Sequence, residues 1–298
     1  IVGALLVLAY DLIRGRQHTL AERRTAALCI GATALIAAIL DSVSLGALGP
    51  IYGHNFILDH LALATRTGVL GLALLTLGVT AGAKLLRHPA EYVAIILFAT
   101  AGFTLMAAAH HLLVAFVSLE LASLSLYVLA GFDKDQRASA EAALKYFLFG
   151  GMATAFLLFG FSLIYGVTGE LEFSRIAQSL AHGHMTPLLA LALVMVLVAF
   201  GFKAAAAPFH LWAPDAYEGA PTPSTALIAS ASKLAGFILF LRLLWPGLSS
   251  LAGDVAKAGN SGGWLILVAL LAGASLLLGN LAALAQSNLR RLLAYSAI

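Results

Sequence analysis

The chain has 298 residues, of which 61% are hydrophobic and 10% are charged. Soluble domains average about 45–50% apolar and about 25% charged residues, so a soluble protein of this size could not hide so much apolar surface. The net charge of +3 is too small to indicate nucleic-acid binding, and the single cysteine, Cys29, excludes a disulfide framework or a thiolate metal cluster. The sequence therefore predicts an all-α protein that crosses the lipid bilayer many times.

Long apolar runs divide the chain into predicted spans, since a helix needs about 20 apolar residues to cross the hydrocarbon layer. In chain order the spans are residues 1–13, 25–47, 63–83, 91–109, 111–131, 142–167, 187–212, 222–245 and 264–285, and a tenth begins at Leu292. The first span has no initiator methionine or charged segment before it, and the last is cut off after Ile298. We therefore expect an internal part of a longer protein, without a signal peptide.

Lysine and arginine residues are distributed unequally between alternate loops. One side of the predicted membrane has eleven: Arg14, Arg16, Arg23, Arg24, Lys84, Arg87, Lys134, Arg137, Lys145, Arg290 and Arg291. The other side has four, which are Arg66, Arg175, Arg242 and Lys257. Because positive residues accumulate on the cytoplasmic side of membrane proteins, we predict that the first side is cytoplasmic.

Several charged residues near the predicted helix ends have simple interpretations. Arg66 and Arg242 can extend along the helix surface to the headgroups, and Asp41 and Asp59 are expected to be solvated at the outer surface. Lys145 is expected to anchor the sixth span at the cytoplasmic interface, with Glu141 one helical turn before it as a partner.

Three ionisable residues lie near the middle of predicted spans: Glu120, Lys203 and Lys233. A charged side chain at the centre of a membrane helix costs about 2.5–3.5 kcal/mol on insertion scales. One interpretation is a structural ion pair, but one carboxylate and two amines leave a positive charge unmatched. The other is a proton-transfer site, because burial favours a neutral lysine, a nearby carboxylate favours a charged one, and a change in their separation loads or releases a proton. We favour the second interpretation.

The backbone after Lys203 is predicted to be irregular. Pro208 removes a backbone donor and leaves the carbonyl of Ala204 without its helical partner, and Gly201 lies just before Lys203. Broken helices beside ionisable residues mark ion sites in many transporters. His210 lies seven residues after Lys203, about two helical turns if the helix resumes, and is a candidate proton relay.

Residues 210–223 contain three prolines and predict a rigid cytoplasmic connector, with Asp215 and Glu218 as part of it and Thr222 as the N-cap of the next span. The nine histidines show no spacing typical of a metal site, and the sequence has no phosphate loop or dinucleotide fingerprint. We therefore expect no metal or cofactor site in this chain.

Four segments of the sequence resemble one known family. They are FKAAAAPFHLWAPDAYEGAPTPSTALIASASKLAGF with the following LRLLW, EAALKYFLFGGMATAFLLFGFSLIYGVTG, LFATAGFTLMAAAHHLLVAFVSLELASLSLYVLAGF and QSNLRRLLAYSAI. They resemble the antiporter-like membrane subunits of respiratory complex I, the proton-translocating NADH:quinone oxidoreductase. The similarity covers most of residues 90–298, whereas residues 1–89 fit by topology more than by motif. Lys233 and the Phe202–Lys203 pair are more similar to subunit N than to subunits L and M.

This resemblance implies an antiporter-like fold of two inverted five-helix repeats, each with a broken helix. It implies N-terminal helices in residues 1–90, the first repeat in residues 91–245, and the start of a second, mostly missing repeat in residues 246–298. Glu120 would match the family's glutamate, Lys203 its broken-helix lysine and Lys233 its connecting lysine.

The function implied by the resemblance is proton translocation by a subunit that has no redox centre of its own. Partner subunits would bind NADH, FMN, iron–sulfur clusters and quinone. The neighbours would be other membrane-arm subunits, antiporter-like subunit M and small subunit K among them, in a bacterial inner membrane.

Other interpretations stay open. The chain could belong to a multi-subunit cation/proton antiporter, which shares the core motif and takes no electrons. It could also belong to a membrane hydrogenase or a photosynthetic-type quinone reductase, with a different electron donor. A purely structural scaffold fits less well, because three ionisable residues lie within the spans.

Overall fold

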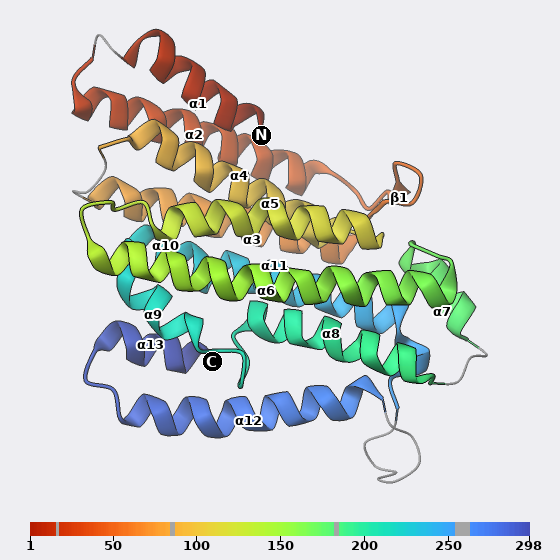
Figure 1. Ribbon diagram of the computed structural model, residues 1–298. Helices are drawn as coiled ribbons and strands as arrows, with labels where there is room; N and C mark the ends of the chain where they lie inside the picture. The colour runs from red at the N-terminus through yellow and green to blue at the C-terminus, as the bar shows by residue number, and fades with distance from the viewer. Residues whose placement is uncertain (16–17, 84–86, 182–184, 254–262) are drawn as a thin grey trace.

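Apolar helices make up most of the computed structural model, which describes residues 1–15, 18–83, 87–181, 185–253 and 263–298 (Figure 1). Within these residues eight segments are long and apolar enough to cross a membrane: α2 (Leu20–Ser44), α3 (His60–Gly82), α4 (Pro89–Ala108), α5 (Leu112–Ala130), α6 (Arg137–Thr168), α8 (Pro187–Ala204), the segment Thr222–Gly247, and α12 (Trp264–Leu284). α1 (Val2–Ile13) is apolar but shorter. The predicted all-α, multi-pass membrane fold is confirmed.

Local sequence signals explain where several helices begin and end. Thr19 forms a capping box with Glu22 at the start of α2. Proline stands in the first turn of α4 and of α8, where its missing N–H has no helical partner. α6 ends at Gly169, which adopts the left-handed conformation with a φ of 70°.

Short elements that the sequence did not predict connect some of the spans. β1 (Gly49–Ile51) pairs antiparallel with β2 (Phe56–Leu58) between α2 and α3. The amphipathic helix α7 (Phe173–Leu180) lies between α6 and α8, with one apolar face buried. α13 (Leu289–Ala297) begins before the predicted start at Leu292.

Two predicted spans are interrupted. The span predicted for residues 187–212 ends at Ala204, and α9 (Trp212–Gly219) is a separate helix in the connector. The span predicted for residues 222–245 consists of α10 (Thr222–Ala229) and α11 (Ala231–Arg242), followed by a π turn at Leu243–Gly247 and a 3₁₀ turn at Ser249–Leu251. The first interruption was predicted from Pro208, although the span ends earlier than residue 212, whereas the prediction of one uninterrupted helix for residues 222–245 is wrong.

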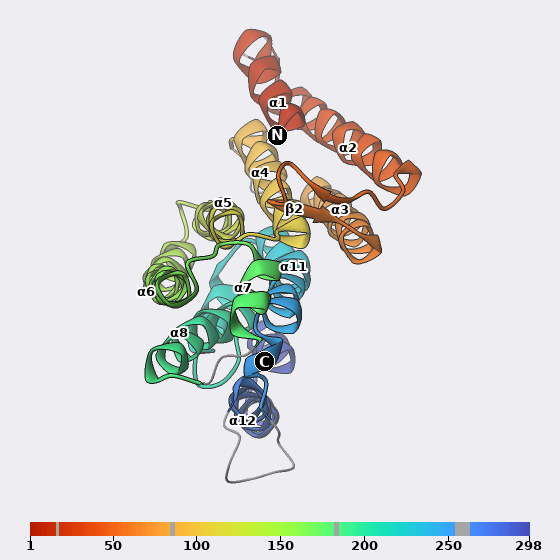
Figure 2. The ribbon, with the colours of Figure 1, turned by 90° about the vertical axis from the view of Figure 1, so that its right-hand side faces the viewer.

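The helices run side by side, with α4 near the centre of the N-terminal part (Figures 1 and 2). α4 contacts α1, α2, α3, α5 and α11, and its Tyr92, Phe103 and Met106 are fully buried. α12 lies at the opposite edge from α1 and α2 and has large exposed leucines, such as Leu276 and Leu281. Such surfaces are stable in a bilayer, where the hydrocarbon is as apolar as the leucines.

Ion pairs join helix ends and connecting segments at each end of the bundle. Lys145 and Arg291 both contact Asp215 at one end, where Arg87 also pairs with Asp135. Arg66 pairs with Asp41 at the other end, and Arg175 pairs there with Glu172. The residues predicted on the cytoplasmic side (Lys145, Arg291 and Arg87) therefore lie at one end of the bundle, and Arg66 and Arg175, predicted on the other side, lie at the opposite end. Arg16, Lys84 and Lys257, which belong to the predicted charge pattern, lie outside the described residues.

Arg242 does not extend to the headgroups as the sequence suggested. Its side chain is 6% exposed, and its Nε donates to the carbonyl of Ala107 at 2.6 Å while its Nη2 lies 2.5 Å from Oδ1 of Asp59. Asp59 also caps α3, where it accepts from the amide of Ala62. Burial raises the pKa of Asp59, but the hydrogen bonds from Arg242 and Ala62 outweigh it and leave this pKa below its usual value. The prediction that Asp59 is simply solvated is wrong.

Candidate functional site

The helix break predicted near Lys203 is present, and the structure satisfies the backbone around it. Ala205 adopts the left-handed conformation with a φ of 58°, which costs a residue with a Cβ about 1–2 kcal/mol. The carbonyl of Phe202 accepts from the amide of Ala205 at 3.0 Å and from the indole of Trp212 at 3.1 Å. Irregular backbone inside a membrane protein is stable only when protein or water supplies such bonds.

Lys203 is buried in the last turn of α8, with 5% of its surface exposed. Its Nζ donates to the hydroxyl of Ser123 on α5 at 3.2 Å. The aliphatic stem packs against Gly236 of α11, where an added Cβ would lie 2.9 Å from Cγ of Lys203. Glycine at this position therefore lets α11 approach the lysine closely.

Glu120 lies three residues before Ser123 on α5 and is partly buried. It accepts a hydrogen bond from the hydroxyl of Thr154 on α6 at 2.8 Å. Although both residues are described by the structure, no ion pair joins Glu120 to Lys203, because each bonds to a hydroxyl instead. The alternative of a direct structural ion pair between these two residues is therefore not supported.

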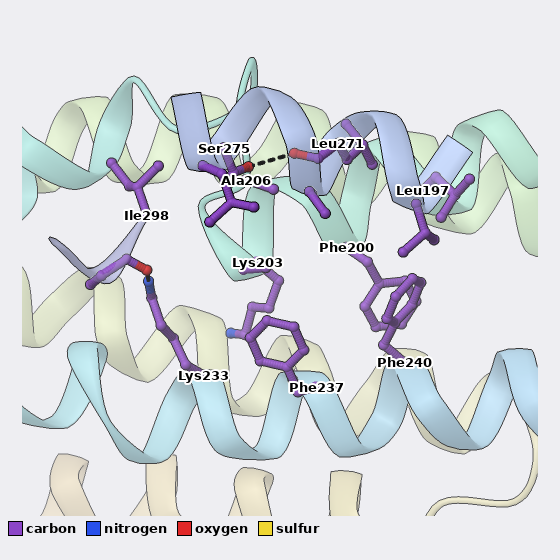
Figure 3. Close-up of a pocket in the computed structure, with 17 residues that line it drawn as sticks. Leu197, Phe200, Lys203, Ala206, Lys233, Phe237, Phe240, Leu271, Ser275 and Ile298 are labelled. Atoms are coloured by element: carbon purple, nitrogen blue, oxygen red, sulfur yellow. Dashed lines mark hydrogen bonds between the residues drawn. The ribbon is translucent and has the colours of Figure 1, made fainter. Parts of the chain in front are cut away.

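Lys233 lies in the first turn of α11, just after the helix is interrupted at Ser230. Its Nζ donates to the carbonyl of Ala297 on α13 at 2.6 Å. Lys203 and Lys233 both line one pocket of about 380 Å³ between α8, α11, α12 and α13. Figure 3 shows the two side chains entering this pocket from opposite ribbons, with Phe237 beside Lys203 and with Phe240 farther along against Phe200. The structure thus brings two of the predicted residues to one cavity.

His210 lies in the turns that follow α8, so the helix does not resume over the two turns that the prediction assumed. Its ring stacks edge-on against Tyr295 of α13, with 6.3 Å between the ring centroids. Its Nδ1 is buried and has no hydrogen-bond partner in the described part of the chain. A relay role for His210 stays a prediction.

Sequence reasoning missed the two hydroxyl residues that bond the ionisable groups. Ser123 could have been found, because residues three apart on a helix share a face and Ser123 follows Glu120 by three. Thr154 could not, because its bond to Glu120 depends on how α5 packs against α6.

The connector after the break is held by a charge cluster that the sequence treated as a stiff linker. Asp215 of α9 contacts Lys145 of α6 at 2.7 Å and Arg291 of α13 at 2.8 Å. Arg291 also contacts Glu218 at 2.8 Å. Burial raises the pKa of Asp215, but the two cations outweigh it and hold this pKa below its usual value. The cluster fixes the connector to helices on both sides.

We predict that Asp215→Asn lowers the stability of the protein at neutral pH by about 1–2 kcal/mol, which lies between the values for exposed ion pairs and for buried hydrogen bonds to charged groups. Since the pKa of Asp215 is lowered by folding, its contribution is present above the unfolded pKa of about 3.9 and is lost as the pH falls through the folded value. Unfolding measured over a range of pH should therefore show the largest difference from the wild type at pH 7 and a difference that shrinks as the pH falls below about 3.9. Asp135→Asn, in the exposed pair with Arg87, is the matched control and should change little. An equal loss of stability in the two variants would show that the cluster around Asp215 stabilises the protein no more than an exposed ion pair does.

Comparison with known proteins identifies the family. A sequence profile described as "NADH:quinone oxidoreductase/Mrp antiporter, TM" matches residues 109–298, which is more than half of the chain. The chain belongs to this family. NADH-quinone oxidoreductase subunit N 2 of Acidobacterium capsulatum is 46% identical over 312 residues, which cover 100% of the chain and 61% of that relative.

Two solved structures contain chains with a similar fold. A chain of respiratory complex I from Thermus thermophilus with bound aureothin matches with a TM-score of 0.74 and 36% identity, covering 99% of this chain and 60% of that one. A chain of the membrane-bound sulfane sulfur reductase, an archaeal respiratory membrane complex, matches with a TM-score of 0.81 and 25% identity, covering 100% and 61%. The chain spans 61% of the length of the Acidobacterium capsulatum relative. The resemblance to subunit N that the sequence predicted is confirmed.

Proposed function

We propose that this chain is part of a proton-translocating subunit of a bacterial NADH:quinone oxidoreductase, of the subunit N type. The observation that carries the proposal is the position of Lys203, which is buried beside a helix break, bonds to α5 and shares a pocket with Lys233. The similarity to named subunit N relatives supports the choice of complex. The proposal divides the chain into N-terminal helices (residues 1–90), a first repeat (residues 91–245) and the start of a second (residues 246–298).

Electrons would move in partner subunits, which would bind NADH, FMN, iron–sulfur clusters and quinone. We propose other membrane-arm subunits as the partners, with subunit M and small subunit K as neighbours, in the bacterial inner membrane. In this assignment the present chain binds, holds and passes protons only.

Glu120, Lys203 and Lys233 would carry the proton, with His210 as a relay. Lys203 is the central residue, because it reaches α5, where Glu120 lies, and also the pocket that contains Lys233. A movement that brings Glu120 closer would favour the charged form of Lys203, and a movement away would favour proton release toward Lys233. Coupling to quinone reduction requires two such states with different neighbours around Lys203.

A second candidate is a subunit of a cation/proton antiporter, because the matching family profile is described for both kinds of protein. The two functions differ in what drives the proton. NADH added to inverted membrane vesicles should acidify their interior if the chain serves the oxidoreductase. A sodium gradient imposed on proteoliposomes of the purified assembly, without NADH, should change the internal pH only if it serves an antiporter.

Lys233→Ala is expected to lower NADH-driven proton translocation by about tenfold or more, since a positioned proton donor contributes at least that much to a transfer step. The reason is that Lys233 is the amine that shares the pocket with Lys203. The rate of vesicle acidification per quinone reduced is the measurement. Lys134→Met removes an exposed lysine outside the spans and should leave this ratio unchanged. Equal ratios in the wild type and Lys233→Ala would remove Lys233 from the path.

A further inference from the structure

A very small cavity lies between α5, α6 and α8, next to Lys203 and separate from the large pocket. Its volume is about 10 Å³, close to the smallest volume that can hold one water molecule. Its polar lining comes from Ser123, Tyr127, Thr154 and Lys203, and its other neighbours are apolar. A buried water needs two to four polar partners, and this cavity offers that number.

The hydroxyl of Tyr127 is the polar group that lacks a partner at this cavity. Tyr127 is 7% exposed, and its hydroxyl oxygen is buried near the hydroxyl of Ser123 but forms no hydrogen bond of good geometry with a described residue. A hydroxyl buried in this way is unfavourable unless something bonds to it. A bridging water supplies such a bond at little loss compared with a direct one.

The position of this hydroxyl is fixed by α6. The ring of Tyr127 packs edge-on against Tyr146 and Phe147, with centroid distances of 4.7 and 5.8 Å. Its hydroxyl lies directly over Gly150, where any Cβ would overlap it. Gly150 thus leaves the space in which the hydroxyl sits at the edge of the cavity.

Glu120 and Lys203 each bond to a hydroxyl that lines this same cavity. Thr154 donates to Glu120 at 2.8 Å, and Lys203 donates to Ser123 at 3.2 Å. Among the described residues, the cavity therefore lies between the hydrogen bond of the amine and the hydrogen bond of the carboxylate. One water in hydrogen-bond contact with Lys203 and Thr154 completes a continuous line from the amine to the carboxylate.

We propose that Tyr127 is a positioning residue that holds one water in this cavity, and that this water joins Lys203 to Glu120 through Thr154. In the loading step, the carboxylic acid of Glu120 gives a proton to the hydroxyl of Thr154, Thr154 gives its own to the water, and the water gives one to the neutral amine of Lys203. The products are a carboxylate and an ammonium, and the water and Thr154 are unchanged. Tyr127 keeps its proton. The use of the water in translocation rests on the proposed function, whereas its presence does not.

The first test is a map of the full-length protein in its native assembly, at a resolution that shows ordered water, for the wild type and Tyr127→Phe. We expect one water density within hydrogen-bond distance of the Tyr127 hydroxyl in the wild type and its loss in the variant. A dry cavity in the wild type overturns the proposal, whether or not the chain moves protons.

The second test measures proton translocation and its solvent deuterium isotope effect in the same assembly. Tyr127→Phe should lower the rate by roughly three- to tenfold, as expected for one lost hydrogen bond, and should change the isotope effect. Gly150→Ala, which displaces the hydroxyl without removing it, should do the same. Tyr165→Phe, on the exposed face of α6, is the matched control and should match the wild type.

A Tyr127→Phe protein with the wild-type rate and isotope effect overturns the positioning role. If Lys203→Ala also keeps full translocation, the proposed function is what fails. The two failures are therefore distinguishable.

Discussion

Lys203→Ala is expected to abolish NADH-driven proton translocation while the protein still folds and assembles. Translocation should fall to background, because Lys203 is the residue that contacts α5 and also lines the pocket of Lys233. The stability of the Lys203→Ala protein should be close to that of the wild type, for a separate reason. Lys203 is 5% exposed and its amine bonds to a neutral hydroxyl, so removal of the amine relieves the cost of burying a charge.

Lys203→Met separates the effect on translocation from the effect on stability more cleanly, because methionine keeps most of the aliphatic stem that packs against Gly236. Vesicle acidification and the thermal stability of the purified assembly are measured together, with Lys134→Met as the control at an exposed site. We expect Lys203→Met to be as stable as the wild type and inactive in translocation. An assembled variant that pumps at the wild-type rate would show that protons do not pass through Lys203.

The sequence was sufficient to predict the spans and the main candidate residues. Apolar runs of about 20 residues have few alternatives to a membrane helix. A charge inside such a run is visible without a structure, which is how Glu120, Lys203 and Lys233 were found. The helix break after Lys203 could also be predicted from the sequence, because Pro208 cannot donate a backbone hydrogen bond.

The second break, at Ser230, had no comparable signal. Serine is compatible with a helix, and nothing in the segment Thr222–Gly247 predicts that α10 ends at Ala229. Both halves contact α3, and α11 alone also contacts α4 and α8, so the break coincides with a change of partners that no local pattern shows. The relay geometry assumed for His210 failed for a related reason, because the chain after the first break forms turns instead of a new helix.

Contacts between residues far apart in the sequence could not be predicted either. Asp215 bonds to residues 70 and 76 positions away, and Arg242 bonds to Asp59 across 183 positions. Local patterns carry no information on which charged residues meet. The same applies to Tyr127 and Thr154, which would be ordinary members of a helix interface were it not for the cavity between them.

Asp59→Ala is expected to destabilise the protein by about 3–5 kcal/mol, the usual result of leaving a buried charge without its partner. The side chain of Arg242 is 6% exposed, and its guanidinium would keep only the carbonyl of Ala107 as a partner among the described residues. The variant also removes the N-cap of α3, which contributes about 1 kcal/mol to that total. Loss of secondary structure during titration with a denaturing detergent measures the effect.

The opposite substitution, Arg242→Met, should cost less, about 1–3 kcal/mol for the unpaired carbonyl of Ala107. The carboxylate of Asp59 is 38% exposed, so water can solvate it, and it can still cap α3. The control is Asp41→Ala, which breaks an exposed pair at the same end of the bundle and should cost less than about 1 kcal/mol. The expected order is therefore Asp59→Ala, then Arg242→Met, then Asp41→Ala. If Asp59→Ala lost no more stability than Asp41→Ala, water would have to reach Arg242. The Arg242–Asp59 pair would then not fix the outer end of α11, the helix that carries Lys233.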